Sequence, residues 1–134
     1  MFFYLFNASL DAVKNMSIAD GFAILKGGDH AATDYLRNNT TSGLTAAFSP
    51  RVKESIDKVK VAQAWEPLTK AYNKAMLFTG GDPVNTDINA YVTELAIRGM
   101  FTLIAEEEGK IRKDPLARVS DLLKKVFGSP EAGN

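Results

Sequence analysis

The chain has 134 residues, of which 46% are hydrophobic and 24% are charged, as in an ordinary globular domain. Lysine and arginine number 16 and equal the 16 acidic residues, so no net field attracts nucleic acid, and no nucleic-acid partner is expected. The chain has no cysteine, which excludes disulfides, thiolate metal sites and cysteine nucleophiles.

Apolar residues near the start of the chain recur at helical spacing and predict a helix that runs to about Met16. Its first turn, Phe2–Phe6, is apolar on every side. This stretch has no basic leader and is too short for a signal peptide or a transmembrane segment. Because so apolar a turn needs cover on more than one face, we expect a protein partner or a homo-oligomer that forms through this helix.

The next helix is expected to begin at Ser17, because Asp20 stands three residues later and completes a capping box. The glycine pair at 27–28 is predicted to end it in left-handed backbone. Asp29 is then a good N-cap for a third helix that carries Tyr35 on its apolar side.

Apolar residues between Leu44 and Val59 keep nearly one helical phase through Pro50. An interior proline costs about 3 kcal/mol, so we expect a restart here, with Ser49 as the N-cap. A further helix is predicted over 61–76 and should break or bend near Pro67.

The segment 78–83 is dense in turn-forming residues and predicts a loop. Thr86 is expected to cap the longest helix of the chain, whose apolar stripe runs from Ile88 to Ile111. The dipeptide 114–115 should interrupt it before a last amphipathic helix over 116–127.

The segments show no convincing two-residue alternation, so the predicted fold is all-α. Short connections between the helices favour a single-domain helical bundle of about six to seven helices. We assign this domain to residues 1–128 and a polar tail to residues 129–134.

Glu107 falls on the apolar stripe of the long helix, close to Ile104 and Ile111. A buried carboxylate needs a basic partner, and a guanidinium matches it in a two-pronged geometry. The interpretation we favour is a buried ion pair that locks helices in register, and the other is a ligand-binding or catalytic carboxylate. The residues proposed for this ligand or ion-pair cluster are Asp29, Tyr35, Arg37, Glu107, Arg112 and Arg118.

No catalytic residue, metal site or cofactor is predicted. The run Glu106–Glu108 could join Asp29 and Asp34 in a cation site, but consecutive helical residues point in different directions. The spacings of Glu106 to Lys110 and of Glu108 to Arg112 are those of surface ion pairs. His30 is the only histidine, and no nucleophile motif accompanies it.

Basic residues give the last third of the chain an excess of positive charge on amphipathic helices. A solvated face is the favoured interpretation, and peripheral contact with an anionic membrane or an acidic partner is the weaker one, because the glutamate run precedes these residues. The residues are Lys110, Arg112, Lys113, Arg118, Lys124 and Lys125.

Four runs occur in order along the chain: GGDHAATDYLR, LTAAFSPRVKESIDKV, FTLIAEEEGKIRKDP and LLKKVFG. In these runs the sequence resembles the bacterial domain of unknown function 4197 family (DUF4197), over about Met16 to Gly128. The resemblance implies an all-helical fold and a periplasmic or envelope-associated location. It implies no activity, and this chain would correspond to the C-terminal part of the family's usual length.

The function expected from these observations is binding rather than catalysis. The domain would bind a partner protein or a small apolar or amphipathic ligand between its helices. The alternative is an enzyme or a divalent-cation-dependent protein that uses Glu107, Asp29 and an arginine.

Overall fold

The computed structural model describes residues 2–133, and Met1, Asn134 and the side chain of Phe2 lie outside that description. The chain is all-α, as predicted, and residues 2–133 contain no strand. Two short 3-10 helices lie near the C-terminus, where η1 follows α5 and η2 follows α6. The elements in chain order are α1 (Phe2–Lys14), α2 (Ile18–Lys26), α3 (Ala31–Val59), α4 (Ala62–Thr79), α5 (Ile88–Lys113), η1 (Pro115–Ala117), α6 (Asp121–Phe127) and η2 (Pro130–Ala132).

The chain divides into two compact units. The first takes the residues up to Ser42 and those from Gly99 onward, and the second is the segment Gly43–Arg98 between them. Helices α3 and α5 each contribute to both units, because the boundaries fall inside them.

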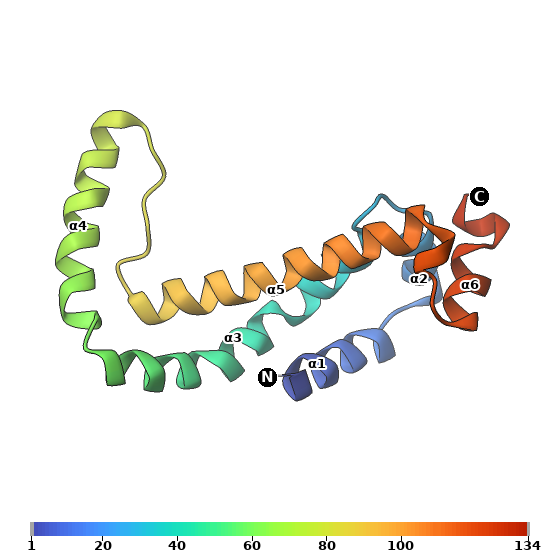
Figure 1. Cartoon of the computed structure of the whole chain (residues 1–134), viewed down its shortest axis with the longest axis horizontal. Coiled ribbons are helices and arrows are strands. Elements are labelled where there is room, and N and C mark those ends of the chain that lie inside the picture. Colours follow the sequence, from blue (N-terminus) through green and yellow to red (C-terminus); the bar gives the residue numbers. More distant parts are fainter. Residues whose placement is uncertain (1, 134) are drawn as a thin grey trace. The chain divides into compact units, whose positions relative to one another are not determined.

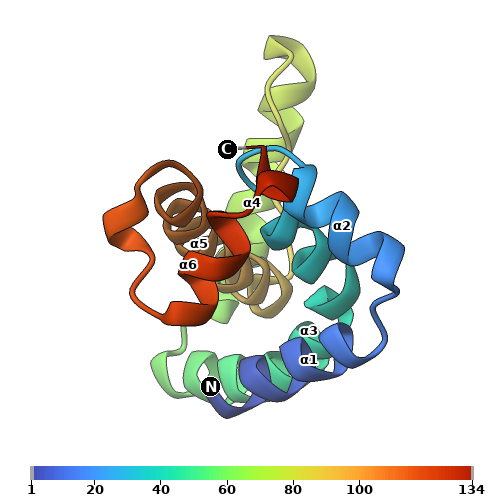
Figure 2. The same cartoon turned by 90° about the vertical axis from the view of Figure 1, so that its right-hand side faces the viewer.

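The first unit contains α1, α2, the beginning of α3, the end of α5 and all the elements that follow. The hydroxyl group of Tyr35 on α3 donates a hydrogen bond of 3.1 Å to the carbonyl oxygen of Ala12 on α1. The 3-10 helix η2 contacts α2 (Figure 2), so the end of the described chain packs back on the unit. The buried hydrophobic residues of this unit are Ala12 and Phe101.

The second unit is organised around α4 and the loop that returns from it to α5 (Figure 1). The amide group of Asn73 donates to and accepts from the backbone of Val84, at 2.7 and 2.8 Å. The indole N–H of Trp65 donates to the carbonyl oxygen of Asn85, and its ring lies 4.9 Å from that of Tyr91. These contacts fasten the loop along one side of α4.

Helix α3 is continuous through Pro50, so the predicted restart at Ser49 is wrong. Leu44, Phe48 and Ile56 are all buried on one face, and a single helix keeps that face in register on both sides of the proline. The hydroxyl of Ser49 instead accepts a hydrogen bond from the side-chain amide of Asn89.

The polar run before this point also stays helical. The side chains of Asn39, Thr40 and Thr41 donate to carbonyl oxygens four residues earlier, so they do not compete with the helix. Helix α4 likewise continues through Pro67, where a break or bend was expected.

Asp87, rather than Thr86, caps the start of α5. One of its carboxylate oxygens accepts hydrogen bonds from the backbone N–H groups of Asn89 and Ala90. Because α3 does not restart, it is longer than α5, with 29 residues against 26. The prediction that α5 is the longest helix is therefore wrong.

The C-terminal helix is shorter than predicted. After α5, Asp114 caps the 3-10 turn η1, and Ser120 caps α6, which begins only at Asp121. Leu116 and Val119 are exposed in the connecting segment, because they lie outside the helix that was expected to bury them. Part of the segment expected to be a polar tail forms η2.

Candidate functional site

An ion pair on α5 is almost completely buried in the first unit. Glu108 and Arg112 lie one helical turn apart, and their side chains are 8% and 10% exposed. The Nη2 and Nε atoms of Arg112 lie 2.7 and 2.8 Å from Oε1 of Glu108. Since both charges are buried, each must also satisfy the rest of its hydrogen-bonding capacity within the protein.

Glu108 completes its contacts at the start of α3. Its Oε1 accepts from the backbone N–H of Ala32 at 2.9 Å, and its Oε2 accepts from the backbone N–H and the hydroxyl of Thr33, both at 2.7 Å. The first N–H groups of a helix have no partner within it and carry partial positive charge. Glu108 is therefore an N-terminal cap that comes from another helix.

Arg112 completes its contacts at the end of α2. Its guanidinium donates to the carbonyl oxygens of Ile24 and Leu25, at 2.8 and 3.1 Å. These carbonyls belong to the last turn of α2, which favours a positive charge. The ion pair thus caps both helix ends at the α2–α3 junction.

Arg118 caps the C-terminal end of α5. It is 7% exposed, and its guanidinium donates to the carbonyl oxygens of Ile111 and Arg112 at 2.9 and 3.0 Å. The Arg112 guanidinium lies 5.3 Å from the centre of the Phe127 ring, within the range of a cation–π contact. The end of α5 is therefore held by the segment that follows it.

The α2–α3 junction is tight, and Gly27 allows it. A β-carbon at position 27 would lie 2.5 Å from the β-carbon of Ala31 and 3.0 Å from the carbonyl oxygen of Ala23. The predicted left-handed backbone is wrong, because Gly27 is extended, with φ of −73° and ψ of −179°. Position 27 therefore requires a glycine because a β-carbon has no room there.

The capping box of Ser17 and Asp20 at the other end of α2 is confirmed.

The surroundings of Glu108 keep its carboxyl group ionised. Burial alone would raise its pKa, but hydrogen bonds from the Thr33 hydroxyl, from the backbone N–H groups of Ala32 and Thr33 and from Arg112 outweigh it. The net result is a pKa below the ordinary glutamate value. Glu108 is thus a permanently charged structural group near neutral pH, which does not suit a general acid.

An apolar pocket of about 390 Å³ lies next to this ion pair, within the first unit. Helices α3, α5 and α6 all contribute to its wall. The wall is almost entirely hydrocarbon, and its charged residues are both glutamates. The lining residues are Ala32, Thr33, Leu36, Leu103, Ile104, Glu107, Glu108, Ile111 and Phe127.

Glu107 is not the buried carboxylate. Its side chain is 66% exposed and pairs with Lys110 on the same helix, so the predicted burial against an arginine is wrong. The error is one of helical phase. The buried face of α5 runs through Ile97 and Phe101, which places Glu108 inside, whereas the predicted stripe ran through residues such as Leu103, which is 64% exposed.

The other residues of the predicted cluster are divided among separate contacts. Asp29 forms an ion pair with Lys113, which lowers the pKa of the Asp29 carboxyl, and it does not cap α3, whose first N–H groups bind Glu108. Arg37 pairs with Asp34 on its own helix, at 3.0 Å, and lies over the ring of Phe101.

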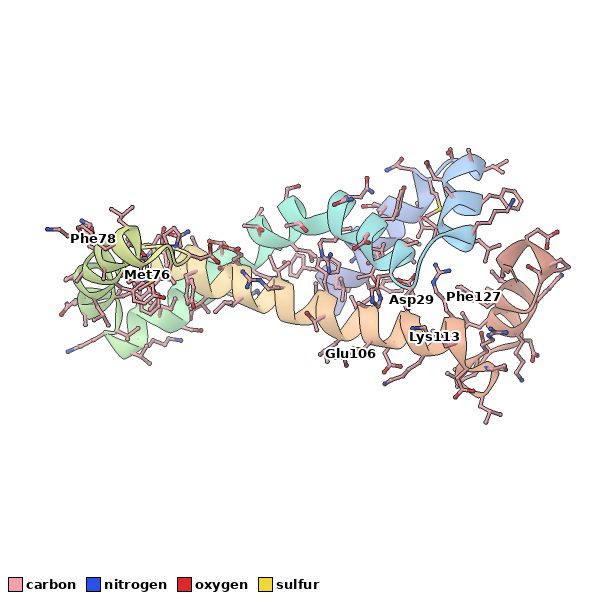
Figure 3. The ribbon with its side chains drawn as sticks, turned by 90° about the horizontal axis from the view of Figure 1, so that it is seen from above. Asp29, Met76, Phe78, Glu106, Lys113 and Phe127 are labelled. Atoms are coloured by element: carbon pink, nitrogen blue, oxygen red, sulfur yellow. The ribbon has the colours of Figure 1, made fainter. Side chains whose placement is uncertain are left out.

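Asp29 and Arg112 line a small polar pocket of about 170 Å³. Figure 3 places Asp29, Lys113 and Phe127 near the C-terminal end of α5, whereas Glu106 lies farther from that end. Arg118 joins Arg112 through the backbone, as described above. Tyr35 and Arg37 are not among the residues that line this pocket or the apolar one.

Glu108 and Thr33 belong to the site although the sequence does not predict them there. The signal was present, since Glu108 and Arg112 have ion-pair spacing and Glu108 shares a helical face with Phe101. That pair was expected at the surface and is buried. In residues 2–133, no group of three or more histidine and acidic side chains is placed to hold a metal ion.

The fold and the site define an all-α protein with an apolar pocket beside a buried ion pair that caps two helices. A family model described as "Protein of unknown function (DUF4197)" matches residues 7–128, so the chain belongs to that family. No curated protein and no solved structure matches the chain.

Proposed function

We propose that the protein binds an apolar or amphipathic ligand in the pocket formed by α3, α5 and α6. The observation that carries this proposal is the pocket of about 390 Å³ with a hydrocarbon wall. Its size falls within the range of pockets that hold small molecules, and a wall of this kind with few polar groups is typical of them.

The charges at the wall indicate which head group the ligand carries. The carboxylate of Glu108 already binds Ala32, Thr33 and Arg112. The side chain of Glu107, by contrast, is exposed and pairs with Lys110, which is exposed as well. A cationic or neutral polar head beside Glu107 is favoured, because an anionic head would meet a like charge. The ligand class is an alkyl chain, or an apolar side chain of a partner protein, next to such a head.

This function is non-enzymatic binding. The alternative, an enzyme or a divalent-cation-dependent protein that uses Glu107, Asp29 and an arginine, draws no support from the geometry. Glu107 pairs with Lys110, and Asp29 pairs with Lys113, so each of these acids is engaged by its own lysine. Within the described residues, the arginine next to Asp29 is held by Glu108.

The location we propose is the bacterial envelope or periplasm, and its support is the sequence resemblance alone. In residues 2–133, no helix combines the length and the hydropathy that crossing a bilayer requires. A protein partner is supported by α1, where four exposed apolar residues share one helical face. They are Phe3, Phe6, Leu10 and Val13.

Calorimetric titration with decylamine, 1-decanol and decanoate tests the proposed pocket. We expect decylamine to bind most tightly, 1-decanol next and decanoate least, because of the glutamates in the wall. Ile104→Trp fills the pocket and should weaken decylamine binding by at least about tenfold, or about 1.4 kcal/mol.

Leu116→Trp is the matched control, because Leu116 is 90% exposed and does not line the pocket. It should bind decylamine as the unchanged protein does. The proposal fails if none of the three probes binds, or if the two tryptophan variants bind decylamine equally well.

A further inference from the structure

The outer face of α4 carries an apolar stripe that nothing in the described residues covers. We name it the α4 seam. Its members repeat at alternating intervals of three and four residues, and every one of them is exposed. The α4 seam consists of Val61, Ala64, Leu68, Ala71, Ala75 and Phe78.

The α4 seam lies apart from the face of α4 that the return loop covers. That inner face contains Trp65, Thr69 and Asn73, which are bound to the loop or to the helix backbone. Gln63 and the charged residues of α4, such as Lys70, lie on a third side. Figure 3 shows Phe78 at the end of α4, where its side chain is 85% exposed.

The spacing of the α4 seam identifies the shape of its occupant. Alternating intervals of three and four residues are the pattern of a coiled coil, in which each apolar side chain inserts between those of a facing helix. The occupant is therefore a helix with a similar seam. No charged residue interrupts the stripe, so an occupant with an equally uncharged seam would leave no charge buried and unpaired.

We propose that a second copy of this chain is the occupant, with the two α4 helices antiparallel across a two-fold axis between residues 69 and 70. In this register Leu68 faces Ala71 of the other copy, so each large side chain meets a small one at the centre. Ala64 faces Ala75, which lets the backbones approach closely, and Val61 faces Phe78 at each end.

A parallel arrangement of the same helices is worse on two counts. It sets every seam residue against its own copy, so that the two Leu68 side chains would meet in one layer and the two Ala71 side chains would leave a gap in the next. It also places the two helix dipoles side by side in the same direction.

The flanking charges tolerate the antiparallel pair. Lys74 is the charged residue of α4 nearest to the α4 seam, and in this register the two Lys74 residues lie about 14 Å apart along the axis. That distance exceeds the screening length at physiological salt, so their repulsion is small. A pair of helices of this length gives an interface at the lower end of the specific range, and the dimer is therefore concentration-dependent.

Disulfide cross-linking of single-cysteine variants tests the register directly, because the natural chain has no cysteine. The Leu68→Cys and Ala71→Cys proteins carry tags of different mass, so that each disulfide product can be identified. They are mixed at about 100 µM, a concentration chosen for a weakly binding interface, and are then oxidised. We expect the yield of the mixed dimer, in which Cys at 68 is bonded to Cys at 71, to exceed the yields of the 68–68 and 71–71 dimers. The Ala64→Cys and Ala75→Cys pair should give the same result. Predominant 68–68 and 71–71 products, or none, would overturn the proposal.

Sedimentation velocity from about 10 µM to 1 mM tests the dimer without cysteines. Ala71→Glu should raise the dimer dissociation constant by at least about tenfold, because it buries charges at the axis. Gln63→Glu adds the same charge on the polar side and should leave the constant unchanged. Circular dichroism verifies that both variants remain helical. A natural chain that stays monomeric, or an Ala71→Glu variant that dimerises as well as the control, would refute the α4 pairing.

Discussion

Two adjacent glutamates of α5 show how far the surroundings of a residue decide its role. Glu107 is exposed and forms an ion pair with Lys110. Glu108 is buried and binds Arg112 and Thr33, which lies at the start of α3. The same side chain is thus a surface group at one position and a structural anchor at the next. The difference arises from a rotation of one residue about the helix axis.

Replacing each of these glutamates by alanine tests the assignment. Glu108→Ala should lower the free energy of unfolding by about 3–5 kcal/mol, because it leaves Arg112 buried without its counter-charge and removes the cap of α3. Glu107→Ala should change it by no more than about 0.5 kcal/mol, as is usual at exposed positions. Urea denaturation followed by circular dichroism measures both, and similar losses in the two variants would contradict the structural role of Glu108.

At the scale of elements, three helix ends in the first unit are held by side chains from outside their own last or first turn. Glu108 caps α3, Arg112 caps α2, and Arg118 caps the helix that carries both of them. The α2–α3 junction can receive these two side chains only if the connecting residues stay close together. Gly27 permits this, because position 27 has no room for a β-carbon.

The two neighbouring glycines of the junction should therefore respond differently to alanine. Gly27→Ala should destabilise the protein by about 1–3 kcal/mol, because its new methyl group meets Ala31 and a backbone oxygen. Gly28→Ala meets nothing within 4 Å and should be neutral or stabilising by up to about 1 kcal/mol. Thermal unfolding of both variants measures the difference, and equal melting temperatures would argue against crowding at position 27.

At the scale of the whole molecule, the buried ion pair makes stability depend on pH. The pKa of Glu108 is lower in the folded protein than its ordinary value of 4.5. Its contribution to the free energy of unfolding is therefore complete above pH 4.5 and is lost as the pH falls through the lower folded pKa. Acid should weaken the junction because a protonated Glu108 no longer balances Arg112.

Comparing the natural chain with Glu108→Gln isolates this effect, since the glutamine does not titrate. Their difference in unfolding free energy should be largest near about pH 6 and should shrink toward about pH 3. Urea denaturation at a series of pH values provides the measurement, and Glu107→Gln is the control. A difference between the natural chain and Glu108→Gln that does not change with pH would rule out Glu108 as the titrating group.

The sequence predicts the features that depend on neighbouring residues and misses those that depend on distant ones. The capping box of Ser17 and Asp20 is local and was predicted correctly. The continuity of α3 through Pro50 was not, because burial of one long face outweighs a lost backbone hydrogen bond.

The candidate site shows the same limit. Arg112 and Arg118 were expected in it and have little exposed surface, yet their partners include backbone carbonyl oxygens that no residue pattern reveals. Glu108 was misplaced because apolar residues also occupy the exposed side of α5, which blurs the helical phase. The exposed hydrocarbon on that side is part of the pocket wall that the proposed ligand would cover.

The bonds at the α2–α3 junction also constrain the order in which the protein can assemble during its synthesis. The contacts from α5 to Thr33 and to Ile24 join residues that are 75 and 88 positions apart in the chain. A ribosome must therefore have released the chain through Arg112 before these contacts can form. Until then the early helices remain without their distant caps, so this unit can reach its final form only after Arg112 has left the ribosome.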